Sequence, residues 1–283
     1  MIPPKTSIRE LRQYFRQLTY AHLPKHWLDD WLLTVLNQPQ TFLITDDGYI
    51  LNDDELARLN TGIARMMSGE PLAYLLGKQA FWGREFMVNP STLIPRPDTE
   101  ILVEAVLNIV AHTQLPHPSI LDLGTGSGCI AITLAKELPH AHVWATDTSQ
   151  DALLVAKHNA ATLGADNCHF VHSNWFSAMT GRFDVIVSNP PYIAPNDTHL
   201  SSLSAEPISA LVAEMDGLAD IITLVTGAHA HLATGGVLAL EHGHTQAQAV
   251  QALLTGAGFC DVRTLKDYGN NDRVSLGYWH EPT

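Results

Sequence analysis

Cysteine and long apolar runs are scarce in this chain of 283 residues, and each shortage argues against a class of protein. The cysteines Cys129, Cys168 and Cys260 are odd in number and far apart, so the sequence predicts neither a disulfide framework nor a zinc site. No run of about 18 apolar residues occurs, which argues against a membrane span. Residues 1–5 lack the charged-then-apolar pattern of a signal peptide. We therefore expect a cytoplasmic protein with reduced cysteines and no membrane partner.

Basic residues are also few, because 16 Lys and Arg stand against 29 Asp and Glu, and the net charge is −13. The imbalance falls on residues 96–283, where 7 basic residues stand against 19 acidic ones. Proteins that bind nucleic acid usually carry a basic patch that neutralises phosphates. Stable binding to nucleic acid is therefore not expected, although the average does not exclude a local basic groove.

Histidine, by contrast, is abundant, with 15 residues that invite a search for a metal site. His140 with His142 and His242 with His244 are pairs two residues apart, which share one face of a strand. No Cys, Asp or Glu completes either pair at a metal-ligand spacing. No metal site is predicted.

The most informative segment is Asn189-Pro190-Pro191-Tyr192, which follows the largely apolar run 183–187. Proline has no N–H and a fixed φ, and the residue before each proline is held extended. The result is a stiff corner that presents the Asn189 side-chain oxygen and nearby backbone carbonyls beside an aromatic ring. Such a corner suits a planar –NH2 group held by both hydrogens. Alone, the tetrapeptide could also be an ordinary turn.

A second signal is the glycine-rich segment Gly124–Gly128, which follows the apolar strand 119–123 and precedes a helix-like run. Glycines let the backbone turn sharply and approach a ligand, and a helix N-terminus offers free N–H groups. Nineteen residues further, the next strand ends at Asp147, where a carboxylate commonly accepts hydrogen bonds from ribose. Cys129 occupies the position of the third glycine of the dinucleotide fingerprint, and no Gly-Lys-Ser/Thr of a P-loop follows. The order of these motifs on successive strands argues against coincidence.

Strands and helices alternate in the second part of the chain. Strands are expected near 119–123, 141–146, 168–172, 183–188 and 235–241. Helices are expected near 99–110, 128–138, 149–163, 217–232 and 245–256. Such alternation indicates parallel β-α-β units. In open α/β sheets ligands bind beyond the carboxyl ends of the strands, where both motifs and Asn174-Trp175 fall.

The first part of the chain reads differently, as a small helical module over residues 1–71. Ser7 with Glu10 and Asn52 with Glu55 are capping-box signatures of helix starts. Residues 72–97 then connect this module to a domain at 98–283, through a predicted hairpin. Within the connection, Phe81 and Arg96 are candidates for the border of a ligand pocket or for a structural role.

Together these motifs resemble the class I S-adenosylmethionine-dependent methyltransferases, in which Asn-Pro-Pro-Tyr is shared by enzymes that methylate exocyclic amino or amide nitrogens. The resemblance narrows to the PrmC/HemK family, the N5-glutamine methyltransferases of peptide chain release factors. It is carried by blocks at Gly69–Gly77, Phe81–Gly83, Leu93–Glu100, Ile120–Gly128, Asn174–Phe176, Ser188–Tyr192 and Asp267–Gly269. The block Leu93-Ile-Pro-Arg-Pro-Asp-Thr-Glu100 favours this family over the related enzyme that modifies a ribosomal protein.

The resemblance implies an α/β, Rossmann-like fold with a mostly parallel seven-stranded sheet, completed by antiparallel strands near 259–264 and 273–279. It implies S-adenosyl-L-methionine as cofactor and S-adenosyl-L-homocysteine as product. Asp147 would hold the ribose hydroxyls, Trp175 would flank the adenine, and Asn189 would lie beside the methionine part. The backbone under the methionine and ribose would be that of Gly124, Thr125, Gly126, Ser127 and Gly128.

The implied reaction is methyl transfer to the side-chain amide of the glutamine in the Gly-Gly-Gln motif of class I release factors. Asn189 and Pro190 are the candidate catalytic residues, each accepting one N–H of that amide, and Pro191 and Tyr192 complete the substrate site. The N-terminal module would dock the release factor. Two departures from the family are Asn174, where Asp is usual, and the lack of an Arg-Phe pair before Glu206. The alternatives are an amino-methyltransferase acting on adenine or cytosine, a ribosomal-protein glutamine methyltransferase, and a non-catalytic nucleotide-binding module.

Overall fold

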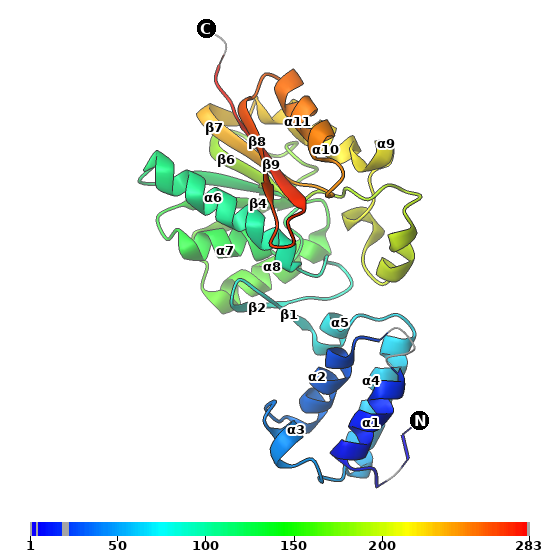
Figure 1. Ribbon diagram of the computed structural model, residues 1–283. Helices are drawn as coiled ribbons and strands as arrows, with labels where there is room; N and C mark the ends of the chain where they lie inside the picture. Colours follow the sequence, from blue (N-terminus) through cyan, green and yellow to red (C-terminus); the bar gives the residue numbers. More distant parts are fainter. Residues whose placement is uncertain (1, 4, 19–22, 282–283) are drawn as a thin grey trace. The chain divides into compact units, whose positions relative to one another are not determined.

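The computed structural model describes residues 2–3, 5–18 and 23–281, which form two compact units. The first unit is Met1–Gly77 and the second is Lys78–Thr283 (Figure 1). The division therefore falls later than the expected residue 71. The reason is a short helix, α5 (Leu72–Leu76), whose Leu72 is buried in the core of the first unit. Gly77 then ends this helix in the left-handed region, with φ of 68°.

The first unit is helical, as its sequence pattern indicates. Its other helices are α1 (Ile8–Leu18), α2 (Lys25–Leu36), α3 (Phe42–Thr45) and α4 (Asp53–Met67). Both predicted capping boxes are confirmed: Ser7 and Glu10 bond each other's backbone N–H groups before α1, and Asn52 and Glu55 do so at the start of α4. The apolar faces of α1, α2 and α4 meet in one buried core.

The predicted hairpin consists of β1 (Lys78–Phe81) and β2 (Arg84–Met87), which pair antiparallel. Phe81 and Phe86 are buried in the core of the second unit. The hairpin therefore belongs to that unit instead of standing apart as a linker. Phe81 is a core residue and does not border a ligand pocket.

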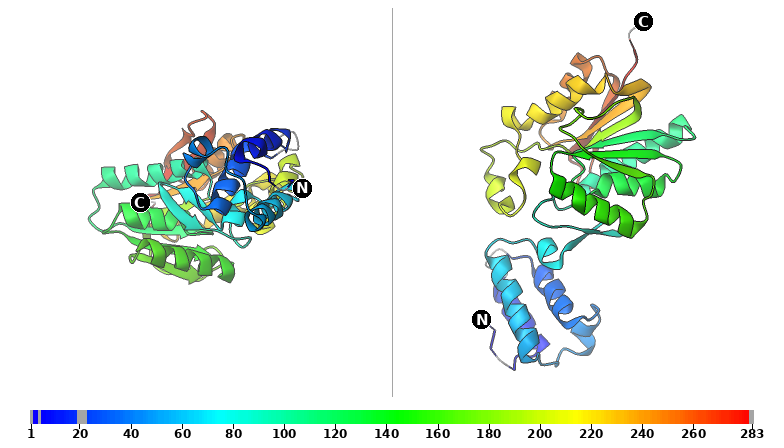
Figure 2. Two further views of the ribbon diagram at one scale, coloured as in Figure 1. Left: turned by 90° about the horizontal axis from the view of Figure 1, so that it is seen from below. Right: turned by 180° about the vertical axis from the view of Figure 1, so that it is seen from behind.

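The second unit is built on a seven-stranded sheet in the order β5-β4-β3-β6-β7-β9-β8 (Figure 1). The strands are β3 (Ser119–Leu123), β4 (His142–Asp147), β5 (Cys168–His172), β6 (Phe183–Ser188), β7 (Leu232–Glu241), β8 (Cys260–Lys266) and β9 (Asp272–Tyr278). Strands β3 to β7 are parallel, whereas β9 runs antiparallel to β7 and β8, which confirms the expected sheet. Figure 2 shows the strands fanning out with the usual twist.

Helices cover both faces of this sheet. They are α6 (Glu100–Thr113), α7 (Cys129–Glu137), α8 (Gln150–Leu163), the short α9 (Glu214–Gly217), α10 (Ala219–Ala228) and α11 (Ala247–Gly256). Helices α6 and α7 share a core with Ile120, whereas α10 and α11 share one with Leu121, because successive strand residues point to opposite faces. Within the described ranges, no helix is long and apolar enough to cross a membrane.

The predicted helix 217–232 corresponds to the shorter α10, Ala219–Ala228, and the segment before it is not a regular helix. Met215, Asp216 and Gly217 have φ of 56°, 56° and 81°, so the backbone turns left-handed within α9, before α10 begins. A β-carbon on Gly217 would lie 2.1 Å from the Tyr192 carbonyl oxygen. Glycine therefore permits both the turn and the close approach of this segment to the proline corner.

The order in which strands are added to the sheet reverses at β3, because β4 and β5 lie on one side of β3 and β6 lies on the other. Ligands of open α/β sheets bind where such a reversal leaves a crevice at the carboxyl ends of the strands. The glycine-rich loop follows β3, and Asn189 follows β6 by one residue. The topology thus brings the two sequence motifs to the same edge of the sheet.

Candidate active site

A cavity of about 680 Å³ lies at this edge. Four successive strands contribute to its wall through the residues that follow their carboxyl ends. These residues include Gly124 and Gly126 after β3, Asp147 to Ser149 after β4, Ser173 to Trp175 after β5, and Asn189 and Pro191 after β6. Five of the predicted cofactor residues thus line one cavity, whose volume suits a cofactor-sized ligand, whereas Thr125, Ser127 and Gly128 do not line it.

The glycine-rich loop forms one side of the cavity. Gly124, Gly126 and Gly128 have φ of 74°, 56° and 83°, a left-handed region that glycine enters without steric cost. Gly124 and Gly126 line the cavity, whereas Thr125 and Ser127 are buried beneath the loop. The backbone N–H groups of Gly124 and Thr125 both donate to the Thr146 carbonyl oxygen, at 2.9 and 2.8 Å, which holds the loop against β4.

Asp147 is fixed by backbone groups on both of its carboxylate oxygens. Its Oδ2 accepts from the Gly126 N–H at 2.9 Å, and its Oδ1 accepts from the Ser149 N–H at 2.8 Å. Burial raises the pKa of Asp147, and these N–H groups act in the opposite direction. Because each carboxylate oxygen has two lone pairs, both retain acceptor capacity toward hydroxyl groups in the cavity.

Trp175 reaches the cavity across the glycine loop. A β-carbon on Gly124 would lie 3.3 Å from the Trp175 ring, so the glycine leaves room for the indole. Asp220 of α10, which the sequence did not single out, lines the same cavity. Burial raises the pKa of Asp220, and a hydrogen bond with Trp175 lowers it. Asn174 is also part of the wall, so a carboxylate and an amide both face this end of the cavity.

Asn189 stands where two cavities meet. A second cavity of about 210 Å³ is lined by Pro190, Tyr192 and Arg96 among others, and shares Leu93, Asn189 and Ala210 with the first. The Asn189 Nδ2 group donates to Thr99 Oγ1 at 3.2 Å. Its Oδ1 can therefore accept a hydrogen bond from a ligand, and the second Nδ2 hydrogen can donate one.

The rest of the corner is held by residues that sequence reasoning missed. The Tyr192 hydroxyl donates to Glu241 Oε1 at 3.1 Å, and burial raises the pKa of Tyr192. The Tyr192 carbonyl accepts from Gln246 Nε2 at 3.0 Å, and the same nitrogen donates to the Asp216 carbonyl. Glu241 and Gln246 follow no local motif, so only the fold reveals them.

The block Leu93–Glu100 serves as an anchor for the loop after Tyr192. Glu206 is buried in that loop, accepts from the Ile94 N–H at 3.0 Å, and pairs with Arg96. Arg96 also lines the second cavity. Glu206 thus fastens the loop, although Ser204 and Ala205 precede it instead of the Arg-Phe pair expected from the resemblance.

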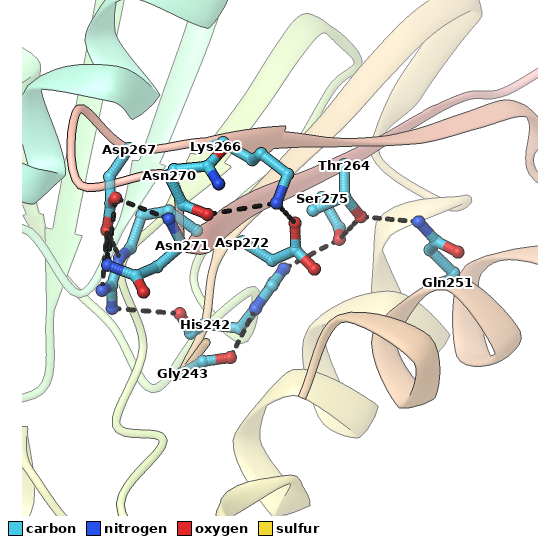
Figure 3. Close-up of polar contacts among 11 residues, drawn as sticks. His242, Gly243, Gln251, Thr264, Lys266, Asp267, Asn270, Asn271, Asp272 and Ser275 are labelled. Carbon is cyan, nitrogen blue, oxygen red and sulfur yellow. Dashed lines mark hydrogen bonds and ion pairs between the residues drawn. The ribbon is translucent and has the colours of Figure 1, made fainter. Parts of the chain in front are cut away.

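The Asp267–Gly269 block forms a turn that holds Arg273. Asp267 accepts from the Asn271 N–H at 2.9 Å (Figure 3). Asp267 also pairs with Arg273 at 3.0 Å. Arg273 also pairs with Asp98 at 3.2 Å, so the turn is tied to the Leu93–Glu100 block.

His242, one of the histidines weighed as a metal ligand, is buried and has other partners. Figure 3 shows its ring between the Gly243 carbonyl and Ser275, with contacts of 2.9 and 2.8 Å. Thr264 and Gln251 continue this chain of hydrogen bonds, and burial lowers the pKa of His242. Among the described residues, no group of three or more His, Cys, Asp or Glu side chains is arranged to hold a metal ion.

This fold and this site define a class I S-adenosylmethionine-dependent methyltransferase. The chain matches the family models described as Methyltransferase small domain, over residues 98–264, and PrmC N-terminal domain, over residues 10–77. It is 45% identical over 265 residues to the release factor glutamine methyltransferase of Yersinia pestis, which covers 93% of this chain and 95% of that relative. The chain belongs to the family of release factor glutamine methyltransferases.

Solved structures agree with the fold. A methyltransferase from Pyrococcus furiosus matches with a TM-score of 0.53 and 19% identity, over 78% of this chain and 99% of that one. The T. thermophilus 16S rRNA N2 G1207 methyltransferase, in complex with AdoMet and guanosine, matches with a TM-score of 0.52 and 22% identity, over 71% of this chain and 49% of that one. At these identities the likeness concerns the fold alone.

Proposed function

We propose that this protein transfers a methyl group from S-adenosyl-L-methionine to the side-chain amide nitrogen of the glutamine in the Gly-Gly-Gln motif of class I peptide chain release factors. The observation that carries this proposal is the position of the Asn189-Pro190 corner at the junction of two cavities. One cavity suits the methyl donor, and the other suits an extended side chain that ends in an amide. The names of the relatives supply the substrate.

The residues of the larger cavity fit the cofactor. Asp147 offers carboxylate oxygens to the ribose hydroxyls, and the side-chain-free edge of Gly124 and Gly126 admits the methionine and ribose. Trp175 provides an aromatic face for the adenine. When bound, the cofactor supplies a methyl group that its positive sulfur has already made electrophilic, and it leaves as S-adenosyl-L-homocysteine.

The corner acts on the amide substrate. An amide nitrogen is a poor nucleophile because its lone pair is delocalised into the carbonyl group. Asn189 Oδ1 and the Pro190 carbonyl oxygen each accept one N–H, which orients the nitrogen and stabilises the positive charge that develops on it. Tyr192, which lines the second cavity, packs beside the flat amide and excludes water, whereas Pro191 lines the larger cavity.

The two units divide the work. The helical unit, predicted as residues 1–71 and bounded in the structure at Gly77, docks the release factor. The methyltransferase domain, predicted as 98–283, includes the hairpin of the connection 72–97. The net charge of −12 over residues 96–283 supports a protein substrate over nucleic acid. Because release factors act in the cytoplasm, the proposed function places this protein there.

The test is incubation of the protein with labelled S-adenosylmethionine and, in separate reactions, a class I release factor, the same factor with its Gly-Gly-Gln glutamine changed to alanine, and total nucleic acid. We expect label only in the unaltered factor, on the peptide that contains the motif. Label in nucleic acid, or equal label in both forms of the factor, would contradict the proposed function.

A further inference from the structure

We propose, on the basis of the function above, that Gln246 is a positioning residue that fastens both ends of the loop 193–216 beside the amide site. This loop starts directly after Tyr192 and ends with Asp216. Ala210, which lies within the loop, lines both cavities. The position of the loop therefore bears on how the substrate amide meets the methyl donor.

The side-chain amide of Gln246 contacts both ends of this loop. Its Nε2 donates to the Tyr192 carbonyl oxygen and to the Asp216 carbonyl oxygen, each at 3.0 Å. Its Oε1 accepts from the Gly243 N–H at 2.8 Å. A carbonyl oxygen can only accept and a backbone N–H can only donate, so these three contacts allow one orientation of the amide. Both Nε2 hydrogens are thus engaged, and one side chain joins three segments.

The place of Gln246 in its own helix does not account for these contacts. Gln246 is the N-cap residue of α11, where a side chain usually accepts a hydrogen bond from the first turn. In the part of the chain that the structure describes, its side chain makes no such capping bond. Its hydrogen bonds instead reach across 54 positions to Tyr192 and 30 positions to Asp216. They therefore hold the loop and not the helix.

The packing at Gly217 shows how closely these segments meet. A β-carbon on Gly217 would lie 2.1 Å from the Tyr192 carbonyl oxygen and 2.8 Å from Gln246 Nε2. The middle of the loop has a separate anchor, because Glu206 accepts from the Ile94 N–H. Loss of the Gln246 contacts should therefore release the ends of the loop beside the proline corner and leave its middle in place.

The test uses two variants of Gln246 at about pH 8. Gln246→Glu keeps an acceptor for the Gly243 N–H but has no N–H to donate, and Gln246→Met has a similar length and neither group. Gln251→Glu is the matched control, because Gln251 lies on the same helix, is also half-buried and lines neither cavity. Calorimetric titration with S-adenosylhomocysteine counts the folded sites in each preparation.

We expect kcat per folded site for release-factor methylation to fall about tenfold in both Gln246 variants, because the amide is held less well against the methyl donor. KM for the factor and the affinity for S-adenosylhomocysteine should stay within about threefold of the wild type. Gln251→Glu should match the wild type in all three quantities. An unchanged kcat per folded site, or a tenfold loss of cofactor affinity that accompanies the fall in kcat, overturns the proposal.

A second readout does not need activity. Hydrogen–deuterium exchange followed by mass spectrometry should show faster exchange in peptides from the loop 193–216 in both Gln246 variants but not in Gln251→Glu. Unchanged exchange in the Gln246 variants also overturns the proposal. If the wild type does not methylate the factor, the proposed function fails, and the exchange alone decides whether Gln246 fastens the loop.

Discussion

Arg273 Nη2 lies 3.2 Å from Asp98 Oδ2, and this pair joins the last strand of the sheet to the segment before α6. The same guanidinium pairs with Asp267, so two carboxylates share one mostly buried cation. Tyr192 and Glu241 lie within its electrostatic reach. The charge of Arg273 therefore links the C-terminal hairpin electrostatically with the proline corner, through Tyr192 and Glu241.

Replacing Arg273 should weaken both the fold and the site. Arg273→Met keeps the length of the side chain but leaves Asp98 and Asp267 facing each other without a cation. We expect the melting temperature to fall by several degrees and kcat to fall with it. Scanning calorimetry and initial rates check this, with exposed Lys157→Met as control. If the melting temperature of Arg273→Met equals that of the wild type, the ion pairs of Arg273 contribute little to stability.

Asn189→Ala should remove the acceptor for one substrate N–H. Loss of one well-placed transition-state partner costs on the order of 10²–10³ in turnover. We expect a folded protein with kcat lowered by that factor and a cofactor affinity that changes much less. Single-turnover methylation with circular dichroism as the folding check measures both quantities. Near-normal turnover would refute the assigned role of Asn189.

Asp147→Ala should act mainly on the cofactor. The change removes the carboxylate that Gly126 and Ser149 hold at the cavity wall, so affinity for S-adenosylhomocysteine should fall about 10- to 100-fold. Calorimetric titration gives the value, and exposed Asp166→Ala serves as control. Unchanged binding in Asp147→Ala would count against a ribose contact.

Asp122 should make stability depend on pH. This carboxyl on β3 is fully buried, and burial raises its pKa to about 7. The folded protein therefore holds a proton between about pH 4 and 7 that the unfolded chain has released, so the contribution of Asp122 to stability falls as pH rises through that window. Asp122→Asn removes this titration.

The expected result is a variant whose stability changes less with pH and exceeds that of the wild type at pH 8, by about 4 kcal/mol at most. Urea unfolding at pH 5.5 and 8 provides the comparison. Equal pH dependence in the two proteins would mean that Asp122 titrates near its ordinary value in the fold.

Sequence reasoning located the parts of the site that short segments determine. The proline corner at Asn189 and the glycine turn fix their own backbone, and strand alternation places both at one sheet edge. The contacts of Thr99, Glu206 and Glu241 were not predicted, because their partners are distant in sequence. Glu206, for example, accepts a hydrogen bond from Ile94, 112 positions away. No local pattern distinguishes such a residue from an ordinary polar one.

Two boundaries that the sequence analysis misplaced, near residues 71 and 217, are set by single residues that can be recognised in the sequence. Gly77 ends α5 in a left-handed conformation, and reading it as a helix stop would have moved the division of the units beyond residue 71. Gly217 marks the break between α9 and α10 in the same way. In contrast, the start of β7 at Leu232 was hidden by Gly235 and Gly236, because glycine is depleted in strands and reads as a turn.

The meeting of the two cavities at Asn189 suggests a design for inhibitors. Under the proposed function, a compound in which a nucleoside portion is bridged to a carboxamide tail should reach both cavities, because they share Leu93, Asn189 and Ala210. Each half then raises the local concentration of the other. Enzymes that bind the same nucleoside but have no second cavity beside it would not bind the tail, so we expect the tail to provide selectivity.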